Sequence, residues 1–226
     1  MLLFACHTAG IFLLSYPAYT RAERIADALV HIVGICAAII GIALLFAVWA
    51  FTMDGPTLAA TILYCAALIL MLTASAAYHM AAHTSARPIL RRLDHAAIYV
   101  KIAGTFTPLA VFLGTAFGYA VVAIVWICAL IGAGTKLMTA PGKMTTGGIP
   151  YVALGWAGLA LLVPLIPVLP GLSLAMIVTG GLLYTAGVVF YCWESLRFAN
   201  AIWHGFIVIA SGCFFIGISA ALAQSG

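Results

Sequence analysis

The chain has 226 residues, of which 66% are hydrophobic and only 6% are charged, with a formal net charge of +4 and a mean hydropathy of +1.23. About a quarter of an ordinary soluble domain is charged, so this composition excludes that class. Long uninterrupted apolar runs favour helices over the alternating strands of a membrane barrel. The sequence therefore predicts an all-α integral membrane protein.

The six cysteines stand singly, mostly within the apolar runs. No two of them form a C-x-x-C pair, so neither a disulfide framework nor a thiolate zinc site is indicated. Buried cysteines of this kind behave as small apolar side chains.

Two regions follow each other along the chain: residues 1–27, a lead and entry segment, and residues 28–226, a transmembrane domain. The domain contains seven apolar runs of about 20 residues, the length that a helix needs to cross the hydrocarbon layer. Because the loops between them are short, consecutive helices should be antiparallel neighbours in a bundle. The predicted spans are Ala28–Phe51, Thr57–His79, His95–Gly114, Gly118–Leu137, Ile149–Leu169, Leu172–Trp193 and Ala201–Ala223.

The basic residues are distributed unevenly among the loops. Eight of the nine Lys and Arg residues lie before the first span or beside alternate loops, and only Lys101 lies inside a span. Loops on the cytoplasmic side of a membrane protein are enriched in Lys and Arg. This pattern predicts a cytoplasmic N-terminus and a C-terminus on the outside.

Polar side chains are concentrated where three predicted spans meet the cytoplasmic side. Ser75 and His79 are four residues apart and share one helix face. Asp94 precedes the third span, and His204 lies near the start of the seventh. The predicted topology puts His79, Asp94 and His204 at one membrane depth. Ionisable groups in a membrane are costly, so we expect a functional site here.

Six segments, in order, resemble the hemolysin III family, the bacterial branch of the progestin and adipoQ receptor family. They are E-R-I-A-D-A-L-V-H-I-V-G, S-A-A-Y-H, R-R-L-D-H-A-A-I-Y, G-T-F-T-P, G-G-L-L-Y-T-A-G and A-I-W-H, and they extend from the first span to the seventh. The resemblance implies a seven-helix bundle in a bacterial inner membrane, with a zinc site near the cytoplasmic face.

The resemblance also implies roles for individual residues. In eukaryotic relatives three histidines hold the zinc; His79 matches one of them, and His204 matches the second histidine of an H-x-x-x-H pair. Asp94 matches a carboxylate that positions a water, and Ser75 matches a serine beside it. The distantly similar alkaline ceramidases use this arrangement to hydrolyse a lipid amide. The first histidine of the pair is Asn200 here, and a neutral amide is a poor zinc ligand.

The third metal ligand is left open by the sequence. Glu23, Asp27 and His31 recur every fourth residue on one face of the first span. One hypothesis is that Asp27 or His31 replaces the missing ligand, and Glu194 is a further candidate. The alternative is a solvated first turn favoured by the helix dipole. If no metal binds, the polar groups instead satisfy one another and cap helix ends.

Lys101 also has two interpretations. Its amine pairs with Asp94 or Asp27, in competition with a metal ion, or its long side chain snorkels to the cytoplasmic headgroups.

Together with this resemblance, the sequence predicts a monomeric zinc-dependent hydrolase of lipid amides or esters. Its zinc ligands would be His79, His204 and Asp94, with Asp94 and Ser75 acting on water and substrate. The expected partner is membrane lipid rather than nucleic acid. The alternatives are a non-enzymatic membrane-homeostasis sensor and a pore-forming cytolysin, although a pore requires polar residues along its whole depth.

Overall fold

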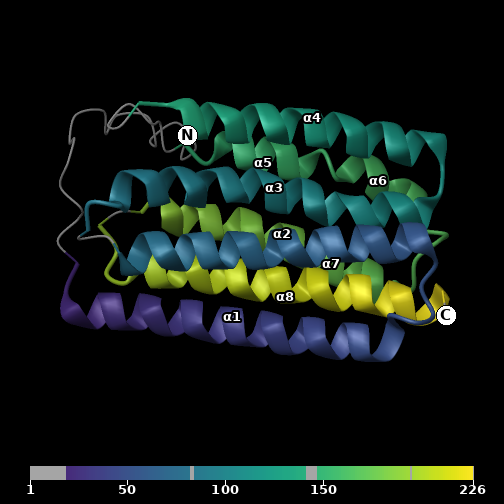
Figure 1. Ribbon diagram of the computed structural model, residues 1–226, viewed down its shortest axis with the longest axis horizontal. Coiled ribbons are helices and arrows are strands. Elements are labelled where there is room, and N and C mark those ends of the chain that lie inside the picture. The colour runs from purple at the N-terminus through teal and green to yellow at the C-terminus, as the bar shows by residue number, and fades with distance from the viewer. Residues whose placement is uncertain (1–18, 82–83, 141–146, 194, 226) are drawn as a thin grey trace.

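The computed structural model describes residues 19–81, 84–140, 147–193 and 195–225, and every regular element in these ranges is a helix (Figure 1). The helices lie nearly antiparallel to one another along the long axis of the molecule. They are α1 (Arg21–Trp49), α2 (Gly55–Met80), α3 (Arg87–Leu113), α4 (Ala116–Met138), α5 (Ile149–Trp156), α6 (Leu159–Leu165), α7 (Gly171–Tyr191) and α8 (Ala199–Ser225).

The central helix of the bundle is α3. It packs against α2 and α4 on its two sides and also contacts α5, α6 and α8. At the other side of the bundle α8 lies between α7 and α1, and α1 also touches α2. This arrangement brings α1, α2 and α8 together, although they are far apart in the sequence.

Among the described residues, six helices are long and apolar enough to cross a membrane: α1 to α4, α7 and α8. Their outer faces expose large apolar side chains such as Leu29, Ile40 and Leu44, as expected for a surface in contact with lipid. The predicted all-α membrane architecture is therefore confirmed at this level.

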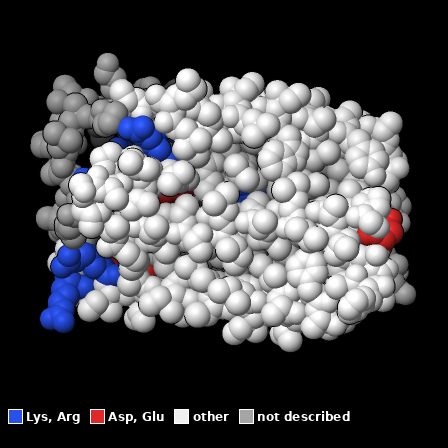
Figure 2. All heavy atoms as spheres, in the orientation of Figure 1, with Lys and Arg blue, Asp and Glu red and all other residues white. Residues whose placement is uncertain are grey.

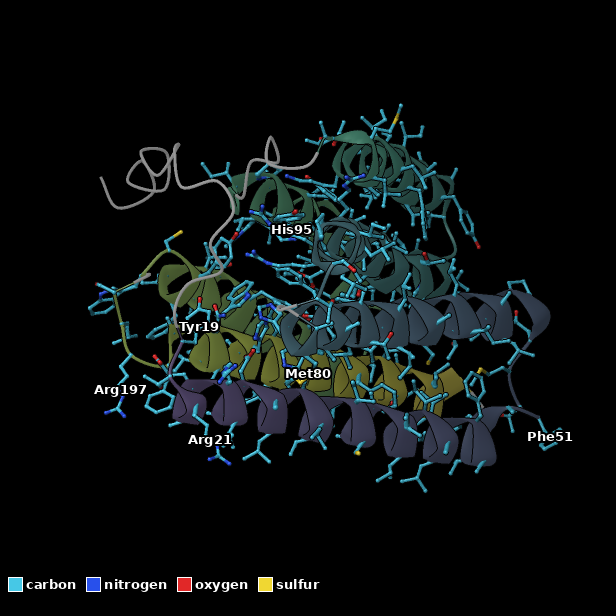
Figure 3. All side chains as sticks on the ribbon, turned by 60° about the vertical axis from the view of Figure 1, so that its left-hand side comes forward. Tyr19, Arg21, Phe51, Met80, His95 and Arg197 are labelled. Carbon is cyan, nitrogen blue, oxygen red and sulfur yellow. The ribbon has the colours of Figure 1, made fainter. Side chains whose placement is uncertain are left out.

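The charged side chains lie mainly at the two ends of the molecule. Figure 2 shows the basic residues gathered mainly at one end, with some acidic atoms near them and others at the opposite end, and a largely uncharged surface between the two ends. We call the first end, where α1, α3 and α8 begin, the basic end. In Figure 3 Arg21, His95 and Arg197 lie there, and Phe51 lies at the opposite end.

The fifth predicted span, Ile149–Leu169, is two short helices rather than one. Helix α5 ends at Trp156 and α6 begins at Leu159, so Gly158 falls in the break and Gly155 lies just before it. The ring of Phe106 on α3 packs where a Cβ on Gly158 would sit, at 2.7 Å. Close packing at a residue with low helix propensity explains why the helix is interrupted here.

Helix α1 begins earlier than the predicted span, at Arg21. Thr20 caps it: its side-chain oxygen accepts from the backbone N–H of Glu23, whose carboxylate accepts from the backbone N–H of Thr20. This capping box starts the helix two turns before Ala28. Of the predicted lead, residues 1–18 lie outside the described residues and residues 21–27 belong to α1.

Gly34 lets α1 and α8 approach each other closely. A Cβ on this residue would lie 2.6 Å from Cγ2 of Val208. His31 lies three residues before Gly34, and His204 lies four residues before Val208, so this contact sits about one turn from both histidines. The absence of a side chain at Gly34 therefore helps to bring the two histidines together.

We predict that Gly34→Ala destabilises the protein although alanine is the better helix former. The added methyl group must displace the stiff, β-branched Val208, at a cost of about 1–3 kcal/mol. Gly181→Ala is the matched control, because nothing lies within 4 Å of its Cβ position. The control should gain up to about 1 kcal/mol. Thermal unfolding in detergent measures both; equal increases in Tm would contradict the close approach.

Candidate metal centre

Three helices bring an acidic residue and three histidines together at the basic end. Asp27 and His31 are on the second and third turns of α1, His79 is in the last turn of α2, and His204 is in the second turn of α8. All four side chains are almost wholly enclosed: the exposed fraction is 5% for Asp27, 3% for His31 and 5% for His204, and that of the His79 side chain is 10%. These four residues form the cluster described below.

The imidazole rings of the cluster are packed against one another. The ring centroid of His204 lies 4.4 Å from that of His79 and 4.4 Å from that of His31, and the last two are 5.6 Å apart. The sequence placed His79 and His204 at the same depth from topology alone. In the structure their rings are also in contact, so the two helix ends converge on one point.

Asp27 lies between the three histidines and links them. Its Oδ1 is 2.6 Å from Nδ1 of His204, and its Oδ2 is 3.4 Å from Nδ1 of His79. Oδ1 also lies 3.8 Å from Nδ1 of His31. Ligand atoms of Asp27, His31 and His204 all lie within 4.8 Å of one another, a spacing at which they could hold a metal ion.

Two hydrogen bonds hold the ring of His31 in place. Its Nδ1 is 2.8 Å from the backbone oxygen of Asp27, and its Nε2 is 3.2 Å from Oγ of Ser75 on α2. An Nδ1–H that donates to a backbone carbonyl fixes the tautomer, so Nε2 carries the lone pair. Ser75 therefore contacts His31, a neighbour that the spacing of Ser75 and His79 did not indicate.

His79 gives the clearest sign that the cluster suits a cation. Its Nδ1 is buried and makes no hydrogen bond, although Oδ2 of Asp27 is nearby. A buried polar atom without a partner is costly, and such atoms often mark a site for a bound water or ion. Two imidazoles and a carboxylate surround this atom, and both are ligand types that metal ions such as zinc accept.

Glu23 connects the start of α1 to the start of α8. Its Oε1 accepts a hydrogen bond of 3.1 Å from the backbone N–H of Phe198, one residue before α8 begins. Phe198 has a left-handed backbone, with φ of 64°, a conformation that a large side chain rarely adopts. The same carboxylate thus completes the cap of α1 and fixes the turn that leads to His204.

Asp94 is buried on α3, with an exposed fraction of 7%. Its Oδ2 lies 3.4 Å from Nδ1 of His95, and the carboxylate is near enough to His79 and His204 to interact with them electrostatically. The predicted common depth is therefore matched by the structure. Direct binding of a metal by Asp94 stays a prediction.

Asn200 lies beside Asp27, where the resemblance would place a histidine. Both residues line a small hollow of about 10 Å³ at the start of α1 and α8, together with Glu23, Phe198 and others. Asp27 thus occupies the neighbourhood in which the missing ligand is expected. Glu194, the other sequence candidate, lies outside the described residues.

The alternative of a solvated first turn is wrong for Asp27 and His31. Both are buried against α2 and α8, because α1 turns this face inward and exposes neighbours such as Ile25 and Leu29. The four-residue spacing in the sequence showed that they share a face. It did not show which way the face points, since that depends on packing between distant helices.

Comparison with known proteins shows the family of this chain. Residues 19–215 match the family model described as haemolysin-III related. The chain belongs to this family. It is 31% identical to the Hemolysin-3 homolog of Bacillus subtilis (strain 168) over 199 residues, which are 87% of this chain and 93% of that protein. It is 30% identical to Hemolysin-3 of Bacillus cereus over 194 residues, 85% of this chain and 89% of that protein.

In this haemolysin-III related chain, Lys101 forms a second polar layer with Tyr184 and Ser211. Lys101 is 3% exposed, and its Nζ donates a hydrogen bond to the hydroxyl of Tyr184 on α7. That hydroxyl lies 2.6 Å from Oγ of Ser211 on α8. Nζ is also 4.1 Å from the ring centroid of Tyr184 and 5.1 Å from that of Phe214, so two aromatic faces border the amine.

Both sequence interpretations of Lys101 are therefore wrong. The amine bonds to neither Asp94 nor Asp27, and it does not reach the headgroups. Lys101 follows Asp94 by seven residues, about 10 Å further into the bundle. At that depth its hydrogen-bond partner is the hydroxyl of Tyr184, a residue 83 positions away in the sequence.

We predict that Asp27→Asn lowers zinc affinity by at least about tenfold, because it removes the carboxylate that touches His79 and His204. Adding Asn200→His to Asp27→Asn should restore zinc, since residue 200 is one turn before His204 on the same helix face. Zinc per chain in purified protein is measured by inductively coupled plasma mass spectrometry. If Asp27→Asn keeps its zinc and His31→Gln loses it, His31 is the third ligand instead.

For the second layer we predict opposite effects from its two main members. Tyr184→Phe leaves the buried Nζ of Lys101 without that oxygen partner and should cost about 1–3 kcal/mol. Lys101→Met replaces a buried amine with an apolar chain of similar length and should be neutral or stabilising. Thermal unfolding in detergent compares them, and zinc content should change in neither. A larger loss for Lys101→Met would show that the amine itself stabilises the bundle.

Proposed function

We propose that this protein is a zinc-dependent hydrolase that cleaves an ester or amide bond of a membrane lipid. The observation that carries the proposal is the buried cluster of three imidazoles around Asp27, in which Nδ1 of His79 has no hydrogen-bond partner. Burying one carboxylate and three imidazoles together costs free energy, so such a cluster in a membrane protein indicates a binding or catalytic role.

The finer architecture belongs to the same proposal. Helices α5 and α6 together provide the fifth of seven crossings, since they form one apolar run, Ile149–Leu165, that packs against α3 and α4 inside the bundle. The basic end faces the cytoplasm of a bacterial cell, in agreement with the enrichment of Lys and Arg on that side of membrane proteins. The protein acts as a monomer in the inner membrane.

Asp27, His79 and His204 are the proposed zinc ligands. Two imidazoles and one carboxylate, with a position left for water, are a known set for catalytic zinc. Bound there, zinc supplies a Lewis acid and makes water more acidic. His31 borders the ligands rather than joining them, because its two nitrogens are already bonded to the backbone of Asp27 and to Ser75.

Asp94 and Ser75 are the proposed catalytic residues. As a water molecule attacks the lipid carbonyl carbon, the carboxylate of Asp94 accepts its proton and then returns it to the leaving alcohol or amine. When substrate binds, the hydroxyl of Ser75 turns from Nε2 of His31 and donates its one proton to the carbonyl oxygen, where negative charge develops. Burial of Asp94 and partial burial of Ser75 limit the access of bulk water to both groups.

The test is release of fatty acid from a panel of phospholipids and ceramides by the purified protein. We expect about one zinc per chain and measurable release. His79→Ala and His204→Ala should lower release by about a hundredfold or more, because each removes a proposed zinc ligand.

Tyr64→Phe is the control for this test, since it deletes a buried hydroxyl in the middle of α2 that has no hydrogen-bond partner. It should keep both zinc and activity. Wild-type protein that holds well under one zinc per chain and releases no fatty acid would refute the hydrolase.

A further inference from the structure

A hollow of about 260 Å³ opens between the start of α1 and the end of α2 and leads to the cluster. Drug-sized ligands occupy pockets of roughly 300–1,000 Å³, so this space suits a headgroup rather than a whole lipid. In Figure 3 Arg21 and Met80, which mark its two sides, lie at the basic end of α1 and α2. The lining residues are Arg21, Arg24, Ile25, Asp27, Ala28, His79 and Met80.

The lining of the hollow has a charged outer part, an apolar part and an inner part formed by residues of the cluster. Arg21 and Arg24 are three residues apart, on one face of the first turn of α1. Ile25 and Met80 border the hollow and are 50% and 48% exposed on the apolar side of the bundle. Asp27 and the nine-tenths buried His79, with its unpartnered Nδ1, form the inner part of the wall.

We propose that this hollow binds the phosphate of an anionic phospholipid and so selects that class of lipid as substrate. Two guanidinium groups on one helix face match a phosphodiester, which accepts hydrogen bonds in a bidentate manner from arginine. A zwitterionic lipid brings its own cation to this place and loses part of the attraction. As a substrate assignment the inference rests on the proposed hydrolase; as a binding site it does not.

The spacing along α1 fits the order of groups in a glycerophospholipid. Asp27 lies three residues past Arg24 and six past Arg21, or about 4.5 and 9 Å further along the helix. The headgroup layer of a bilayer is about 5–7 Å thick on each side. A phosphate held by the arginines therefore leaves the ester carbonyls, a few bonds further inward, at the level of Asp27 and His79.

The apolar part of the lining favours a phospholipid over a soluble phosphate compound as the ligand of the hollow. The acyl chains of the bound lipid can leave the hollow past Ile25 and Met80, whose exposed side chains already face the lipid side of the bundle. A soluble sugar phosphate has nothing to place against these two residues.

The experiment is native mass spectrometry of the detergent-purified full chain, offered equal amounts of phosphatidylglycerol and phosphatidylcholine in the presence of a zinc chelator. We expect wild-type protein to prefer phosphatidylglycerol. Arg21→Gln with Arg24→Gln should lower this preference by at least about tenfold, because each basic residue beside an anionic headgroup is worth about fivefold.

Two further variants separate the hollow from general surface charge. Arg91→Gln with Arg197→Gln removes the same charge from the basic end but from residues that do not line the hollow, and should change the preference by less than about twofold. Ala28→Phe keeps both arginines and fills the hollow, so it should also abolish the preference. Each variant is compared only if its Tm stays close to that of the wild type.

Several outcomes would overturn the inference. They are an equal affinity of wild-type protein for the two lipids, an equal loss in the two arginine double variants, an unchanged preference in Ala28→Phe, and displacement of the lipid by glycerol phosphate at comparable concentration. The chelator removes zinc and so prevents hydrolysis during the binding measurement. If the protein without chelator shows no hydrolase activity but the lipid preference is present, only the proposed function is refuted. Hydrolysis without any lipid preference would refute only this inference.

Discussion

The contact between Asp27 and His204 is the interaction on which the basic end of this molecule depends. It joins α1 to α8 at 2.6 Å, inside the bundle, between residues 177 positions apart in the chain. A buried carboxylate needs partners, and here two imidazoles from α2 and α8 supply them. The same requirement makes the end of α2 close against the starts of α1 and α8, so that one cluster fixes three helices.

The neighbouring features all serve this convergence. Gly34 removes the side chain that would hold α1 away from α8, and Glu23 ties the turn before α8 to the cap of α1. Deeper in the bundle Lys101, Tyr184 and Ser211 join α3, α7 and α8 in the same manner. At the opposite end a hydrogen bond links α7 to α8: the hydroxyl of Ser173 donates to the backbone oxygen of Gly217 at 2.7 Å. The chain thus concentrates its costly groups where chemistry is possible and leaves the rest of the bundle apolar.

Much of this arrangement follows from the sequence, because apolar length and loop charge decide which segments cross and which ends share a side. That reasoning brought His79 and His204 to one level and marked Asp27 and His31 as members of one helix face. It could not show that this face turns inward, since the direction depends on the contact of Gly34 with a residue 174 positions later. The partner of Lys101 was missed for the same reason. The break between α5 and α6 was missed because two glycines within an apolar run do not by themselves end a helix.

The central claim is that side chains from three helices share one metal ion. X-ray absorption at the zinc edge of the purified full chain tests it most directly. The account predicts a low-coordinate shell of nitrogen and oxygen atoms, with the outer-shell scattering of two imidazoles and bond lengths of about 2.0–2.2 Å. A shell of oxygen atoms without imidazole scattering, or one containing sulfur, would contradict it.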